Sequence, residues 1–144
     1  MSIRYQLFGI PKTFYEFVDK VQRRGDADLE IFVRSYSDGS LEEKPIGDKM
    51  FSYMSNTHYF VELWAGKRRF RLTEHTPRVG DFFSTMVEIE EVIRNTFVEA
   101  VKAAERLEVC GLEAKINGQG VEKVREAIMH YDKRIKSLGD SCNQ

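Results

Sequence analysis

The stretch HYFVELWAGKRRFRLTEH, residues 58–75, decides the fold. Before and after Ala65 and Gly66, apolar side chains suited to a core recur at every second residue. This period of two is typical of β-strands. A short glycine-containing break between two such runs is typical of a tight hairpin turn. We therefore predict two antiparallel strands, residues 58–64 and 67–73, joined by a two-residue turn at Ala65-Gly66.

This turn sets the register, with Trp64 opposite Lys67. Because successive side chains of a strand point to opposite faces, the hairpin separates into two sets. One set is expected to face the core and consists of Tyr59, Val61, Leu63, Phe70 and Leu72. The other set forms a polar face and consists of His58, Phe60, Glu62, Trp64, Lys67, Arg69 and Arg71. A slip of one residue would bury the arginines, so the pattern favours this assignment of faces.

Further strands are predicted from the same alternation. The segment SIRYQLF, residues 2–8, alternates before the first helix, and DLEIFVRSY, residues 28–36, alternates after it with Leu29, Ile31 and Val33 inward. SDGS, residues 37–40, is a turn signal. A loop is predicted at Pro45 and Gly47. Two further short strands are predicted, one at KMFSYM (residues 49–54) and one in LEAKI (residues 112–116).

Three amphipathic helices are predicted at residues 11–24, 83–109 and 121–138. Ser84 is expected to cap the second helix, and Gly111 to end it in a left-handed conformation. Each helix carries an apolar stripe at helical spacing: Phe14, Phe17, Val18 and Val21; Met86, Ile89, Ile93, Phe97, Ala100, Ala104 and Leu107; and Val121, Val124, Ile128, Tyr131, Ile135 and Leu138. The last two stripes can be buried against each other within one chain or in a helix-mediated dimer.

Strands joined by turns and followed by helices indicate an α+β domain. We predict an antiparallel sheet of about four to five strands, with the helices packed on one face and a long C-terminal helix pair among them. Residues 1–138 are expected to form a single domain, and residues 139–144 a flexible polar tail. A doubly wound parallel fold is disfavoured because its helices would alternate with every strand.

Composition limits the function classes. The chain has 144 residues, 42% of them hydrophobic, which is enough for a core, and its formal net charge is −1. A general nucleic-acid or membrane-surface binder is usually basic as a whole, so neither class is favoured. No apolar run approaches the roughly 20 residues of a membrane span, and we expect a cytoplasmic protein. Cys110 is expected to be a free buried thiol; Cys142 lies in the polar tail, and neither belongs to a zinc motif.

The polar face of the hairpin is the candidate binding surface. Five Lys/Arg residues lie between residues 65 and 79, against one acidic residue, Glu74. An ordinary solvated sheet face would explain them through a Glu62–Arg69 ion pair and a cation–π contact of Arg71 with Phe60. Aromatic rings among guanidinium groups also suit the binding of an anion or a planar ring. The candidate ligand-binding residues are His58, Phe60, Trp64, Lys67, Arg69, Arg71 and Arg78.

Catalytic and metal motifs are not evident. His58 and Glu62 share a face but lie about 13 Å apart along a strand, at roughly 3.3 Å per residue, so they cannot bind one metal ion. His75 could approach His58, yet no third ligand is evident. We therefore predict no catalytic residues, no metal and no cofactor. NGQG before the last helix is the one loop that could hold an anion, through the backbone at Gly118 and Gly120, although a plain turn explains it as well.

The sequence thus favours a non-enzymatic binding protein that holds or sequesters a nucleotide-like or other anionic small molecule. One alternative is a protein-interaction module, an inhibitor or accessory subunit, that binds an acidic protein surface with the same face. A second alternative is a small enzyme acting on a phosphorylated substrate. No membrane partner is expected, and a homo-oligomer through the C-terminal helices is compatible with the apolar stripes.

Overall fold

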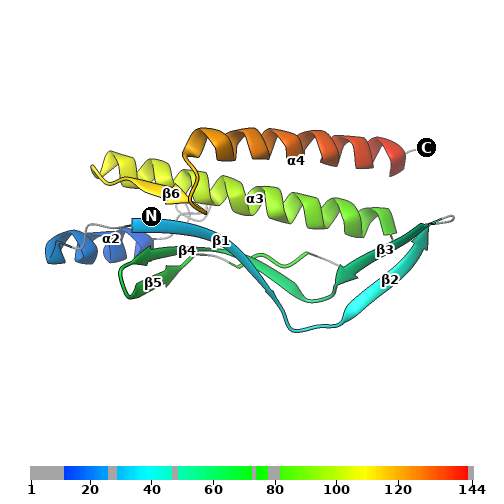
Figure 1. Cartoon of the computed structure of the whole chain (residues 1–144), viewed down its shortest axis with the longest axis horizontal. Coiled ribbons are helices and arrows are strands. Elements are labelled where there is room, and N and C mark those ends of the chain that lie inside the picture. Colours follow the sequence, from blue (N-terminus) through cyan, green and yellow to red (C-terminus); the bar gives the residue numbers. More distant parts are fainter. Residues whose placement is uncertain (1–11, 26–28, 47–48, 73, 78–81, 143–144) are drawn as a thin grey trace.

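The structure is a computed structural model, and it describes residues 12–25, 29–46, 49–72, 74–77 and 82–142 (Figure 1). The predicted strand at residues 2–8 lies outside these ranges. The elements in chain order are α2 (Lys12–Arg24), β1 (Leu29–Ser37), β2 (Leu41–Ile46), β3 (Lys49–Met54), β4 (Thr57–Ala65), β5 (Arg68–Arg71), α3 (Phe82–Val109), β6 (Ala114–Ile116) and α4 (Val121–Cys142). The α+β class is confirmed.

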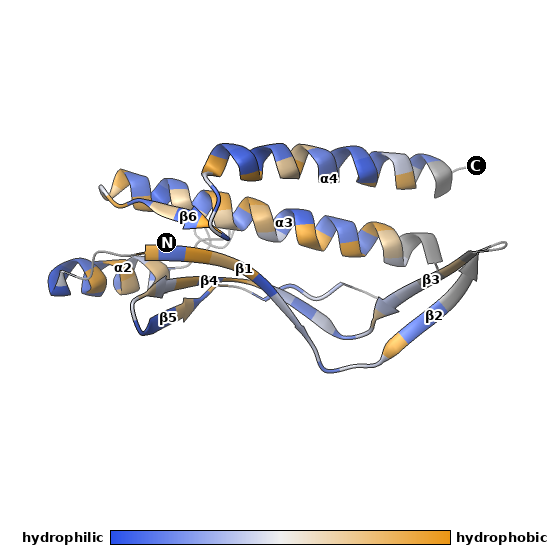
Figure 2. Cartoon of the chain, in the orientation of Figure 1, coloured by the Kyte–Doolittle hydropathy of each residue, from blue (hydrophilic) through white to orange (hydrophobic). Residues whose placement is uncertain are grey.

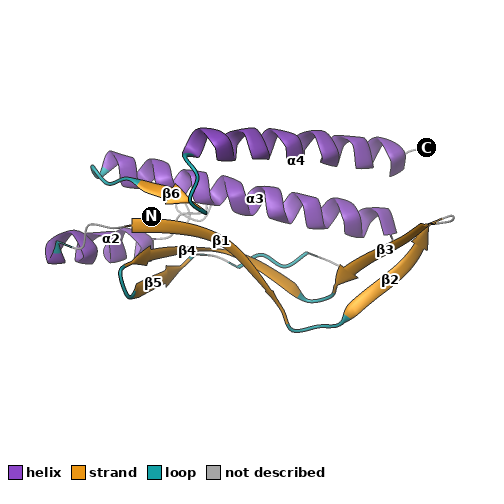
Figure 3. Cartoon of the chain, in the orientation of Figure 1, coloured by secondary structure: helices purple, strands orange, loops and turns teal. Residues whose placement is uncertain are grey.

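The main sheet is mixed, not purely antiparallel as predicted (Figure 3). Its four strands lie in the order β5-β4-β1-β6, with β4 antiparallel to both β1 and β5. The short strand β6 pairs with β1 in parallel, and Ile31 lies opposite Ile116. The long helix α3 causes this difference, because it carries the chain back along the sheet before β6 begins.

Strands β1 to β4 form one long bent hairpin. Its first half pairs β1 with β4, and its second half pairs β2 with β3 as a separate two-stranded sheet. Three residues, 38–40, separate β1 from β2, whereas two residues, 55 and 56, separate β3 from β4. The extra residue bends the ribbon, as a β-bulge does. The predicted turn at SDGS is therefore a bend within the hairpin. Pro45 lies in a strand and not in the predicted loop, and Gly47 lies outside the described residues.

The β4–β5 hairpin exists, but its predicted register is wrong by two residues. Trp64 pairs with Arg69 and not with Lys67, because the turn residues are Gly66 and Lys67. Gly66 has a φ of 61° and occupies the first turn position, where a type II′ turn favours glycine; Ala65 would be strained there. A shift of two residues leaves every side chain on its predicted face.

The helices cover one face of the main sheet, and the core lies between these layers (Figure 2). Five predicted inward residues of the strands are buried, namely Leu29, Ile31, Val61, Leu63 and Leu72, whereas Val33 and Tyr59 are partly buried. Phe70 is partly buried and stacks on Phe17 of α2 with the ring centres 5.5 Å apart. The period-two and helical patterns therefore identified the core-facing side of each element.

Helix α3 ends as predicted but begins earlier. Gly111 has a φ of 77°, and the Leu112 N–H donates a hydrogen bond to the Leu107 carbonyl, which is the Schellman arrangement of a helix end. The helix begins at Phe82, so Ser84 lies in its first turn and is not the N-cap. Cys110, at the end of this helix, is exposed and not buried as expected.

Helices α3 and α4 are antiparallel neighbours, so the intramolecular seam exists (Figure 1). Phe97 stacks on Tyr131 across this seam with the ring centres 5.9 Å apart. Arg94 pairs with Asp132 at 2.8 Å, and Arg134 pairs with Glu90 at 2.9 Å. Helix α4 continues to Cys142, so residues 139–142 of the expected polar tail are helical. None of the helices in the described ranges has the length and apolar character needed to cross a membrane.

Candidate functional site: a cationic and aromatic sheet face

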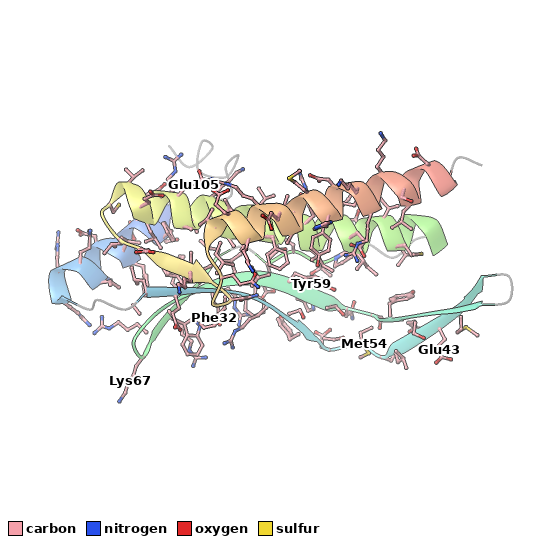
Figure 4. All side chains as sticks on the ribbon, turned by 45° about the horizontal axis from the view of Figure 1, so that its top comes forward. Phe32, Glu43, Met54, Tyr59, Lys67 and Glu105 are labelled. Carbon is pink, nitrogen blue, oxygen red and sulfur yellow. The ribbon has the colours of Figure 1, made fainter. Side chains whose placement is uncertain are left out.

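The side of the main sheet opposite the helices carries the candidate site, which we call the outer face. Because β1, β4 and β5 bury alternate side chains against the helices, the remaining side chains point the other way. Lys67 extends from the adjoining turn, away from the helices (Figure 4). The outer face consists of Glu30, Phe32, Arg34, Tyr36, His58, Phe60, Glu62, Trp64, Arg69 and Arg71.

Trp64 is the centre of the first cluster on this face. The guanidinium carbon of Arg69 lies 4.9 Å from the centre of the indole ring, and that of Arg34 lies 5.0 Å from it. Phe32 packs edge-on against the indole at 5.5 Å, and Arg34 also lies 4.6 Å from the Phe32 ring centre. Within the described residues, neither Arg34 nor Arg69 forms an ion pair. Their positive charges are therefore held in place by aromatic rings and not by carboxylates.

Arg71 organises the second cluster. Its guanidinium carbon lies 3.8 Å from the Phe60 ring centre and 5.9 Å from that of Tyr36. It donates hydrogen bonds to Glu74 at 2.6 Å and to Glu62 at 3.5 Å. The hydrogen bond with Glu74 raises the pKa of Arg71 above its ordinary value. Arg71 is thus already paired, unlike Arg34 and Arg69.

Glu62 is a buried carboxylate on the outer face, with 7% of its surface exposed. It accepts a hydrogen bond from the Trp64 indole N–H at 3.1 Å as well as the bond from Arg71. Buried carboxylates are costly unless they are paired in this way. Glu62 therefore connects the two clusters and fixes the indole ring.

His58 lies at the end of the outer face nearest the bend. Its ring lies 4.7 Å from that of Tyr36, its Nδ1 lies 2.7 Å from the Thr76 hydroxyl, and its Nε2 lies 3.5 Å from Asp38. These contacts connect β4 to the neighbouring segments. His58 is half-buried, and its position is explained by these structural contacts.

The predicted site residues are brought together only in part. The Arg71–Phe60 contact is confirmed, but Phe60 is 5% exposed, so its ring does not lie open to solvent as expected. The predicted Glu62–Arg69 ion pair is wrong, because the register places Arg71 opposite Glu62 and Arg69 opposite Trp64. Arg78 lies outside the described residues.

Sequence reasoning missed the contribution of β1 to this face. Phe32, Arg34 and Tyr36 alternate with the core residues of β1, and they become neighbours of Phe60 and Trp64 because β1 pairs with β4. The alternation was visible in the sequence. The pairing of β1 with β4 was not, because it joins segments that are far apart in the chain.

The NGQG loop is a tight turn. Asn117 and Gly118 have φ angles of 50° and 76°, as in a type I′ turn, and the Ile116 and Gln119 backbones hydrogen-bond to each other in both directions. The Asn117 side-chain oxygen accepts a hydrogen bond from the Val33 N–H at 2.9 Å. The Asn117 and Gln119 N–H groups of this loop donate to the Ile31 and Ile116 carbonyls, so the loop is fixed to β1 and to β6.

An ion pair between His75 and Glu99 lies apart from the outer face. His75 Nε2 lies 2.9 Å from a carboxylate oxygen of Glu99 on α3, and Glu99 is 4% exposed. The hydrogen bond with Glu99 raises the pKa of His75 above its ordinary value, against the opposing effect of partial burial. In the described part of the chain, no group of three or more His, Cys, Asp or Glu side chains could hold a metal ion.

Comparison with known proteins gives no assignment. No protein-family model, no curated protein and no solved structure matches the chain. Function therefore has to be inferred from the geometry of the outer face.

Proposed function

We propose that the protein is a non-enzymatic binding module and that its outer face binds an acidic surface of another protein. The observation that carries this proposal is the pair Arg34 and Arg69, which both stack on Trp64 and form no ion pair within the described residues. Arginine that stacks on an aromatic ring keeps the N–H edges of its guanidinium group for a carboxylate. Two such groups on one indole ring suit bidentate binding of acidic side chains.

Stacking also lowers the entropic cost of binding. A free arginine side chain loses about 0.5–1.5 kcal/mol of conformational freedom when an interface immobilises it. Arg34 and Arg69 are already restricted by Trp64, and Trp64 is itself fixed by its hydrogen bond to Glu62. Trp and Arg are also the residue types that most often dominate binding energy at protein interfaces.

A protein partner is favoured over a stacked planar ligand. Guanidinium groups already lie over Trp64 and Phe60, so a nucleobase would have to displace an arginine in order to stack on either ring. Exposed apolar side chains also continue along the hairpin. Leu41 and Met50 on the arm of β2 and β3 are among them. A large surface of this kind suits a macromolecule.

The nucleotide-like ligand expected from the sequence is the second candidate. Arg34 and Arg69 flank one indole, so a single phosphate could contact both guanidinium groups. A thermal-shift series with nucleotides separates the candidates, because a ligand that binds only the folded state raises the melting temperature. Saturable stabilisation by a nucleotide favours the second candidate.

Affinity capture tests the proposed function. The wild-type protein is compared with the double variant Arg34→Gln/Arg69→Gln and with the control Lys133→Gln/Lys136→Gln, which removes the same charge from exposed positions on α4. We expect the outer-face variant to lose an acidic protein partner that both other proteins retain. Retention of every partner by the outer-face variant would contradict the proposal.

A further inference from the structure

A pocket lies on the other side of the sheet, between the bend of the long hairpin and α3. It has a volume of about 310 Å³, at the small end of the roughly 300–1,000 Å³ that ligand sites occupy. The bend brings the arm of β2 and β3 up toward the beginning of α3 (Figure 1). The residues that line the pocket are Ser35, Tyr53, Met54, Ser55, Asn56, Thr57, Tyr59, Pro77, Thr85 and Ile89.

The lining has a distinct chemistry. Six of these ten residues carry a hydroxyl group, whereas Met54, Pro77 and Ile89 supply apolar walls. No charged side chain is among the described residues that line the pocket. Such a lining favours an uncharged ligand, because an ion would lose its hydration without gaining an opposite charge.

Two of the hydroxyl groups have no hydrogen-bond partner in the part of the chain that the structure describes. Thr57 donates to the Met54 carbonyl, and Ser55 is bonded to the backbone of Ser40, so these two are used within the bend. Tyr59 and Ser35, by contrast, have no side-chain hydrogen bond to any residue in the described ranges. Both belong to neighbouring strands and are directly paired across the β1–β4 ladder. Their side chains therefore lie on the same face, next to each other.

Tyr59 is suited to donate a hydrogen bond. Partial burial raises the pKa of its hydroxyl, and Tyr131 and Glu90 raise it further, so the group stays protonated at neutral pH. Its ring lies between the sheet and the helices (Figure 4). The Tyr59 ring thus supplies a flat wall, and its hydroxyl supplies a polar group that has no hydrogen-bond partner among the described residues.

We propose that this pocket binds a small uncharged molecule that combines a planar ring with hydroxyl or carbonyl groups. The ring lies against Tyr59, Met54 and Ile89, and the polar groups hydrogen-bond to the hydroxyls of Tyr59 and Ser35. Nucleosides and simple phenols share this chemistry. The site is independent of the outer face, because the sheet separates the two.

Titration monitored by amide NMR of the whole chain tests this site, with uridine and catechol as the two probes. We expect one of them to give saturable shifts at the amides of Asn56, Thr57 and Ile89. Tyr59→Phe, which keeps the ring, should weaken that binding about five- to tenfold, as expected for one lost hydrogen bond. Tyr36→Phe on the outer face is the matched control and should leave binding unchanged. No saturable shift with either probe, or equal binding to Tyr59→Phe, would overturn the proposal.

Discussion

The guanidinium group of Arg71 lies over the ring of Phe60 at 3.8 Å, so an aromatic side chain that points away from the core is nevertheless only 5% exposed. Arg71 also pairs with Glu62, which is buried beside it. The outer face of the sheet is therefore a packed layer in its own right. Its arginines have different roles: Arg71 completes this layer, whereas Arg34 and Arg69 lie on it and form no ion pair with any described residue.

Arg71→Ala should destabilise the protein by roughly 1–3 kcal/mol, because it uncovers Phe60 and takes a hydrogen bond from a buried carboxylate. Arg69→Ala is the matched control. It removes only a stacking contact with Trp64, so it should cost less than about 1 kcal/mol. Urea unfolding of the two variants measures the difference. Equal costs would show that Arg71 does not cover the Glu62–Phe60 pair in solution.

Val61→Asp should cost roughly 4 kcal/mol or more, since Val61 is 0% exposed and the new carboxylate would be buried without a partner. Ser52→Asp introduces the same side chain at an exposed position of β3 and should change the free energy of unfolding little. Thermal or urea unfolding of both variants tests which face of β4 is buried. A Val61→Asp protein with the same melting temperature as the wild type would contradict that assignment.

Gly39→Ala should destabilise the bend by roughly 1–3 kcal/mol, as overpacking does. A Cβ atom at this position would lie 2.4 Å from the Ser55 backbone oxygen, so the two strands would have to move apart. Gly139→Ala is the contrasting change, because α4 has open space there and alanine favours a helix by about 0.5–1 kcal/mol. Chemical denaturation should therefore show opposite signs for the two substitutions. Stabilisation by Gly39→Ala would exclude the close contact.

The His75–Glu99 ion pair predicts a pH dependence of stability. The pKa of His75 is raised in the folded protein, so its stabilisation is fully present below the unfolded value of about 6.5 and is lost as the pH rises through the folded value. His75→Gln should remove this slope. His130→Gln, at an exposed position of α4, should retain it. Unfolding free energies from pH 5.5 to 9 test the prediction, and identical slopes for wild type and His75→Gln would contradict it.

Local patterns were sufficient to assign the faces of the elements. The alternation in β4 placed Val61 and Leu63 in the core because a buried side chain recurs every second residue in a strand. The assignment of faces remained correct although the turn was misplaced. The partner of Trp64 is two residues further along the chain than predicted, and a shift of two residues leaves each strand side chain on the same face. The turn was predicted at Ala65-Gly66, but glycine is favoured at the left-handed first position, which places the turn at Gly66 and Lys67.

Long-range pairings could not be obtained from the sequence. Strand β6 has three residues, and its parallel pairing with β1 depends on the path of α3. SDGS could be predicted only as a turn, because the same residue types form both turns and bulges, and the pairing of β2 with β3 decides between them. Arg34 was missed as a site residue for the same reason. It reaches Trp64 only because β1 lies beside β4.

Trp64 provides the most direct test of the outer face, because it is the only tryptophan in the chain and lies between Arg34 and Arg69. Its fluorescence is followed while a glutamate-rich peptide is added, at low and at high salt, to the wild type, to Arg34→Gln/Arg69→Gln and to Lys133→Gln/Lys136→Gln. We predict a saturable change in the wild type and in the α4 control that weakens as salt screens the charges and disappears in the outer-face variant. An equal change in the outer-face variant, or no saturable change in the wild type, would contradict the account.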